Sequence, residues 1–84
     1  MNWNKLQHDF GKVKVGEKLE TTFEYLGGEA LEASDFHKMC TCTGFTWDRA
    51  RGILTVGLKN DAPGYKSSFI KVKGVDLSFK AIAE

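Results

Sequence analysis

Alternation of apolar and polar residues with a period of two constrains the fold of this chain more than any other feature. In VDLSFKAIA, residues 75–83, one face holds Val75, Leu77, Phe79, Ala81 and Ala83, and the other holds Asp76, Ser78 and Lys80. Successive side chains of a β-strand point to opposite faces of its sheet, so this pattern is typical of a half-buried strand. The stretches KLETTFEYL, GILTVGL and SSFIKVK alternate in the same way, and HDFGKVKV indicates a short first strand bent at Gly11.

Turn signals rich in glycine separate these stretches. They are Val15-Gly16-Glu17, Gly27-Gly28, Arg51-Gly52, Asn60-Asp61 with Pro63-Gly64, and Lys73-Gly74. Strands repeating about every 8–12 residues predict an antiparallel sandwich or a small barrel of about six or seven strands. The stretch GGEALEASDFHKM is ambiguous, because it fits either the start of a strand or one helical turn.

Size and composition indicate one globular domain spanning residues 1–84. Apolar residues make up 42% of the chain, which is too many for a disordered protein, and the net charge of +1 gives no general attraction to nucleic acid or membrane. The N-terminus has no apolar run, so we expect no signal peptide and a cytoplasmic location in the producing cell. In that compartment the two cysteines are expected to be reduced.

The stretch DFHKMCTCTGFTW holds both cysteines, Cys40 and Cys42. In a strand these two side chains would lie side by side on one face, a position that seldom meets the geometry of an S–S bond, so a direct disulfide is not expected. The leading interpretation is structural: both thiols are buried as small hydrophobic groups, and the threonines between them suit a strand.

Two chemical interpretations of the same stretch stay open. His37, Cys40 and Cys42 are three soft ligands within six residues, and His8 is a potential fourth, although the second ligand pair usual in zinc sites is absent. Alternatively, one cysteine is a redox or nucleophilic thiol activated by His37 or Lys38. A thiol or metal-binding module is therefore the alternative function.

Residues 1–6, which include Trp3, are predicted to form an N-terminal arm. An exposed tryptophan on an arm often docks onto a partner, but this one is equally compatible with folding back to plug one end of the domain. Trp47 is expected to fill the core, and Asp48 is expected to hydrogen-bond locally in a turn.

The predicted strand SSFIKVK carries the other candidates for partner binding. Phe69, Lys71 and Lys73, with Lys66 nearby, combine an aromatic ring with positive charges, as nucleic-acid-binding sheets do. Lysine on an exposed strand also protects sheet proteins from aggregation, and this second interpretation is favoured. A nucleic-acid-binding sheet is kept as the third function.

Motifs along the whole chain match those of a known family. Asp9-Phe10-Gly11, Thr22-Phe23-Glu24-Tyr25, Gly27-Gly28 and Cys40-Thr41-Cys42-Thr43 occur in this order, followed by closing stretches GILTVGLKN and SSFIKVKGVDLSFKAIA. In these motifs the chain resembles a bacterial family of uncharacterised immunoglobulin-like domains of the ASH or Hydin type, with Cys-Thr-Cys where that family usually has Cys-Gly-Cys. The resemblance implies a single immunoglobulin-like antiparallel β-sandwich of about seven strands and implies no activity.

The sequence shows no phosphate loop, nucleophile elbow or paired catalytic carboxylates, so neither enzymatic activity nor a cofactor is expected. We expect a protein–protein interaction or assembly module that binds a protein partner, a repeating assembly or further copies of itself. By fold analogy, an accessory protein that decorates or cements a phage virion is the specific hypothesis, with the virion as its location.

Overall fold

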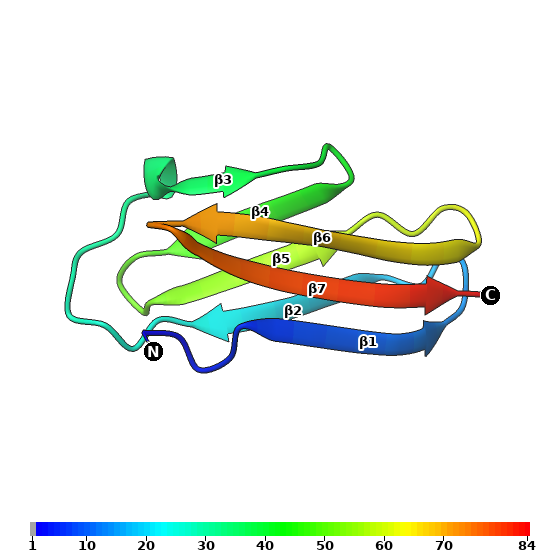
Figure 1. Ribbon diagram of the computed structural model, residues 1–84, viewed down its shortest axis with the longest axis horizontal. Helices are drawn as coiled ribbons and strands as arrows, with labels where there is room; N and C mark the ends of the chain where they lie inside the picture. The colour runs from blue at the N-terminus through cyan, green and yellow to red at the C-terminus, as the bar shows by residue number, and fades with distance from the viewer. Residues whose placement is uncertain (1) are drawn as a thin grey trace.

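The computed structural model describes residues 2–84 and consists of two β-sheets packed face to face (Figure 1). The strands are β1 (Gln7–Val13), β2 (Leu19–Glu24), β3 (Phe36–Lys38), β4 (Thr43–Asp48), β5 (Ile53–Leu58), β6 (Gly64–Val72) and β7 (Val75–Ala83), with a 3-10 turn, η1 (Ala33–Asp35), before β3. One sheet has the order β1-β7-β6-β3 and the other the order β2-β5-β4. Among the described residues no helix is long and apolar enough to cross a membrane.

This arrangement confirms the predicted sandwich of seven strands, and neither sheet closes into a barrel. The chain moves between the sheets in the order of a constant-type immunoglobulin domain, in which the second, fourth and fifth strands form one sheet and the third, sixth and seventh the other. Strand β1 joins the second of these sheets through a parallel pairing with β7, whereas the other strand pairs are antiparallel.

The predicted alternation places the core correctly. Strand β7 has the bounds expected from the sequence, and Leu77 and Phe79 on its inner face are buried. The same holds for Leu54 and Val56 of β5, and for Ile70 of β6. Apolar faces of both sheets therefore meet in one core, whose burial is the main favourable contribution to folding.

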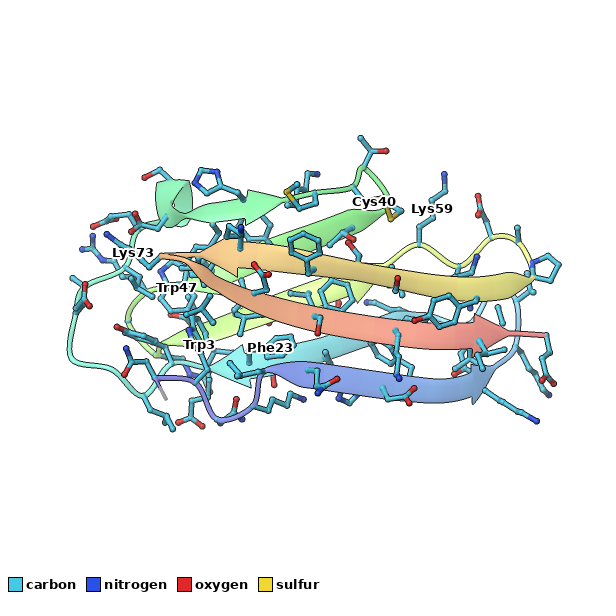
Figure 2. The ribbon with its side chains drawn as sticks, viewed as in Figure 1. Trp3, Phe23, Cys40, Trp47, Lys59 and Lys73 are labelled. Atoms are coloured by element: carbon cyan, nitrogen blue, oxygen red, sulfur yellow. A yellow bond between two sulfur atoms is a disulfide. The ribbon has the colours of Figure 1, made fainter. Side chains whose placement is uncertain are left out.

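The N-terminal segment is part of the domain and not an exposed arm, which corrects that alternative for Trp3; Met1 lies outside the described residues. Trp3 is 3% exposed and pairs with Tyr25 in a β-bridge, and its ring lies 5.0 Å from that of Tyr25, 6.1 Å from that of Trp47 and 6.2 Å from that of Phe36. The backbone N–H of Asn4 also donates to the carbonyl of Glu24 at 2.9 Å. The interpretation in which Trp3 plugs one end of the sandwich is therefore the one observed (Figure 2).

After this contact the chain crosses to the other sheet and forms β1, whose pairing with β7 shifts between Asp9 and Lys12. Gly11 has a φ of +74° there, and its N–H donates to the Asp9 carboxylate at 2.8 Å. Glycine adopts positive φ without the steric cost that other residues meet, so the bend expected at Gly11 is confirmed as a β-bulge.

The stretch between β2 and β4 is where the sequence was ambiguous, and it contains both of the predicted alternatives. The 3-10 turn η1 is followed directly by the three-residue strand β3. Trp47 in β4 packs half-buried against the core, and its Nε1–H donates to the carbonyl of Leu31 at 2.9 Å. The Asp48 carboxylate accepts the N–H of Arg51 at 3.1 Å, which confirms the expected turn.

Candidate functional site

The two cysteines form a disulfide, which corrects the expectation that a direct bond between them would not form. That expectation assumed a strand, but β3 ends at Lys38 and β4 begins at Thr43, so Cys40 and Cys42 lie in the turn that carries the chain from one sheet to the other. In a turn the side chains of residues i and i+2 can approach each other, and their Cα atoms are 5.2 Å apart, within the range of natural disulfides.

Both cysteines are half-buried, and Cys42 packs against the core, so the interpretation of both sulfurs as fully buried core filler is correct only in part. Phe36, before the turn, and Thr43, after it, supply the buried groups at this place. Because the disulfide occupies a turn at the end of the sandwich, the sulfurs border solvent as well as the core.

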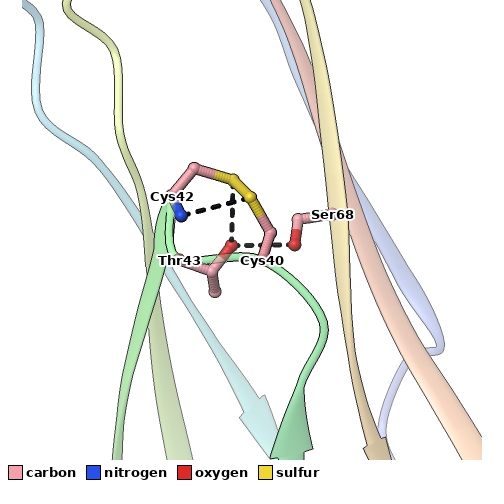
Figure 3. Close-up of a disulfide and its surroundings, with 4 residues drawn as sticks. All are labelled: Cys40, Cys42, Thr43 and Ser68. Carbon is pink, nitrogen blue, oxygen red and sulfur yellow. Dashed lines mark hydrogen bonds between the residues drawn. A yellow bond between two sulfur atoms is a disulfide. The ribbon is translucent and has the colours of Figure 1, made fainter.

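Hydrogen bonds hold this turn in place (Figure 3). The backbone N–H of Cys42 donates to Sγ of Cys40 at 3.1 Å. The buried hydroxyl of Thr43 donates to Oγ of Ser68 in β6 at 2.8 Å, which links the two sheets. Thr43 and Ser68 satisfy each other, as buried polar groups must.

The predicted metal ligands His37, Cys40 and Cys42 do not form a metal site in this structure. Both sulfurs are already bonded to each other, and a thiolate is the form that binds metal. His37 lies in β3 opposite Lys71 and is exposed. Within residues 2–84 no group of three or more His, Cys, Asp and Glu side chains is placed to hold a metal ion.

The candidate residues of β6 divide between the two faces of the sheet. Phe69 and Lys71 alternate with the buried Ile70 and Val72 and lie on the outer face, as predicted. Lys73 lies beyond the strand, in the turn between β6 and β7, with a φ of +49°.

Lys66 lies instead on the inner face, two residues before the buried Ser68, so it does not join the predicted group. Its neighbours are the residues around Cys42, because Lys66, Lys59, Asp61 and Cys42 line one shallow hollow of about 340 Å³.

Lys71 and Lys73 are each paired with an acidic side chain. Lys71 lies 3.9 Å from the carboxylate of Asp76, and Lys73 lies 3.6 Å from that of Asp35. A backbone hydrogen bond from Glu32 is the main cause that lowers the pKa of Asp35, and Lys73 contributes. These pairs leave little net positive charge on the outer face, which is unfavourable for binding phosphate groups.

A groove on the outer face lies beside an open edge of β6, a feature that the sequence analysis missed. Strand β3 pairs only with residues 70–72 of β6, so within the described chain residues 64–69 have no neighbouring strand on that side. The groove has a volume of about 510 Å³ and is lined by Met39, Tyr65 and Phe69 among others. Met39 and Tyr65 are 62% and 67% exposed. The unusually short β3 could not be read from the sequence, because its pattern of three residues is too brief to show a period.

Comparison of the chain with protein-family models, with characterised proteins and with solved structures finds no match. The resemblance to the immunoglobulin-like family of the ASH or Hydin type therefore stays a prediction.

Proposed function

We propose that this protein is a non-enzymatic binding module that captures an extended segment of a partner protein at the open edge of β6. The observation that carries the proposal is the free backbone of residues 64–69 beside the exposed side chains of Met39 and Tyr65 and the half-buried ring of Phe69. An unpaired strand edge presents a row of N–H and C=O groups, and an added strand satisfies them while neighbouring pockets select its side chains.

The side chains along this edge specify what kind of segment fits. Tyr65 and Phe69 lie on the outer face and favour apolar residues at alternate positions of the added strand. Lys66 lies on the inner face at the same edge, and Lys59, which lines the hollow beside it, is paired with Asp61 at 3.4 Å. An acidic residue at the positions between the apolar ones would complement the charge of Lys66.

A second copy of the chain fits this edge less well than a different protein does. Two β6 edges paired about a twofold axis would bring the inward-pointing Lys66 of each copy close together at the new interface. Like charges at paired positions are destabilising, and inward-pointing charges are a known protection of edge strands against self-pairing. We therefore favour an acidic, partly apolar segment of another protein as the occupant.

The finer proposal is that this partner belongs to a phage virion, on which the domain would act as a decoration or cement protein. Its support is fold-level analogy, since small immunoglobulin-like domains suit repeated attachment to an assembly. The protein's sedimentation with purified virus particles from infected cells, at a constant number of copies per particle, would support this proposal. Its absence from such particles would refute the virion location and leave the edge proposal standing.

A displayed library of random extended heptapeptides tests the edge proposal directly. We expect the wild-type protein to enrich peptides in which acidic and apolar residues alternate. The variant Lys66→Glu should enrich basic residues at the acidic positions, because the charge at the edge is reversed. The matched control Lys12→Glu changes an exposed lysine of β1 on the opposite edge of the sheet and should select the same peptides as wild type.

Hydrogen exchange of the complexes with the selected peptides locates the site. Added protection of the amides of residues 64–69 supports the proposal. Enrichment that Lys66→Glu leaves unchanged, or protection confined to other strands, would refute it.

A further inference from the structure

We propose that the Cys40–Cys42 disulfide is a thiol–disulfide exchange site that reacts with small acidic thiols of the glutathione class. In this assignment the incoming thiolate attacks Sγ of Cys42, and Sγ of Cys40 leaves. The inference needs no added strand, since it concerns the turn between β3 and β4, but this turn shares Lys59 and Lys66 with the edge proposed above, and Cys40 lines the same groove.

The position of the disulfide argues against a purely structural role. It joins residues two apart within one turn, so it restrains the unfolded chain far less than a bond between distant segments would. The contact that ties this turn to the opposite sheet is the hydrogen bond from Thr43 to Ser68, not the S–S bond. Opening the disulfide should therefore leave the sandwich intact.

The surroundings of Cys42 favour the approach of an anion. Lys59, Lys66 and one acidic residue, Asp61, line the hollow that Cys42 borders; Nζ of Lys59 lies 3.4 Å from the Asp61 carboxylate, so Lys66 leaves this hollow with an excess of positive charge. Lys38 lines an adjoining hollow that also includes Cys42, in which basic and acidic residues are balanced. The N–H of Lys59 donates to the carbonyl of Cys42 at 2.7 Å, which fixes this lysine beside the turn (Figure 2). Positive side chains raise the local concentration of thiolate anions and stabilise them during attack.

The surroundings of Cys40 favour its departure. The backbone N–H of Cys42 donates to Sγ of Cys40 at 3.1 Å, and this donor is part of the same turn (Figure 3). A hydrogen bond to a sulfur that becomes negatively charged is strengthened as the charge develops. A better-stabilised leaving thiolate accelerates exchange.

The reaction balances in two steps. In the first, a glutathione thiolate forms a bond to Sγ of Cys42, the S–S bond breaks, and its electron pair stays on Sγ of Cys40. In the second, another glutathione thiolate attacks the glutathione sulfur of this mixed disulfide and releases Cys42 as a thiolate. Two glutathione molecules are oxidised to their disulfide, the protein disulfide is reduced to two thiols, and water supplies the two protons that the protein thiolates take up.

A comparison of two reagents tests the site. The oxidised protein is mixed with excess glutathione, which is acidic, or with cysteamine, which is cationic, at low salt; the reaction is quenched with acid and the products are counted by mass spectrometry. Each rate is divided by that of the same reagent with the urea-unfolded oxidised chain, which removes the intrinsic reactivity of the thiol. We expect glutathione to react faster with the folded protein than with the unfolded chain. The ratio of these two rates should be smaller for cysteamine.

Charge variants identify the cause. Replacing Lys59 or Lys66 by Gln should reduce the preference for glutathione about threefold for each charge removed, as expected for exposed charges. The control Lys12→Gln lies outside these hollows and should leave the preference unchanged. Peptide mapping of the quenched mixed disulfide should find glutathione on Cys42.

Three outcomes would overturn the proposal. The first is a folded disulfide that glutathione opens more slowly than that of the unfolded chain. The second is equal preference for both reagents, unaffected by the lysine variants. The third is loss of the β-sheet far-UV spectrum when the disulfide is reduced, because this would show that the bond holds the fold together.

Discussion

Replacing Trp3 by Ala tests whether the N-terminal segment belongs to the domain. Trp3 is 3% exposed, and three aromatic rings surround it at centroid distances of 5.0–6.2 Å. Truncating a buried tryptophan to alanine costs about 3–5 kcal/mol. A domain of this size has a total stability of roughly 4–13 kcal/mol, so Trp3→Ala should remove a large part of it.

Urea unfolding followed by far-UV circular dichroism measures this loss, since the remaining Trp47 would complicate a fluorescence signal. With an m-value of about 1 kcal/mol/M, the midpoint should fall by about 3–5 M. Trp3→Phe keeps an aromatic ring in the cluster and should lose less. The control Leu26→Ala removes a side chain that is 59% exposed nearby and should change the stability by less than about 0.5 kcal/mol. A loss below about 1 kcal/mol for Trp3→Ala would refute the docked position and restore the exposed arm.

Three further predictions concern buried polar groups and acid stability. Thr43→Val leaves the Ser68 hydroxyl buried without its partner and should cost about 1–3 kcal/mol in urea unfolding; adding Ser68→Ala should recover part of this, and a further loss instead would contradict the pairing. Asn60→Ala removes two hydrogen bonds from Nδ2 to backbone carbonyls of the β1–β2 turn, at 2.8 and 3.0 Å, and should cost about 1–3 kcal/mol of stability. Asn60→Asp should lose the same stability, because a carboxylate has no N–H to donate. Burial is the main cause that lowers the pKa of His8 below its ordinary 6.5, so the unfolded chain binds this proton more readily than the folded protein does. The free energy of unfolding should therefore fall as the pH drops below about 6.5. The pKa of Asp35 is lowered from 3.8, which adds a second loss of stability below about pH 4. Unfolding midpoints measured across this range should lose the first slope in His8→Gln and the second in Asp35→Asn, and unchanged slopes would show that other groups cause the acid sensitivity.

The strands and their buried faces follow from local pattern, and this is why they could be predicted. Successive residues of a strand face opposite sides of its sheet, so the alternation within residues 75–83 predicts which face is buried without information from the rest of the chain. The bend at Gly11 and the turn at Asp48 were predictable for the same reason, since both depend on residues close in sequence. The position of Phe69 on the outer face of β6 was predicted correctly for the same reason.

The candidate site was less predictable because it depends on where strands end. The disulfide requires β3 to stop at Lys38, and the open edge of β6 requires the same short β3. A strand of three residues is too short for its alternation to show where it ends. The prediction therefore placed Cys40 and Cys42 in a strand, which was wrong. Lys66 was grouped with Phe69 because they are near in sequence, although alternation places them on opposite faces.

Composition and alternation were thus sufficient to establish an all-β domain and to say which side chains of each strand point inward, because those properties arise within a few consecutive residues. The assignment of strands to sheets, the burial of Trp3 and the free edge of β6 arise from contacts between segments far apart in the chain, and the joined sulfurs depend on where the pairing of β3 with β6 ends. Such contacts form only when the two sheets pack, and no local pattern encodes which segment meets which.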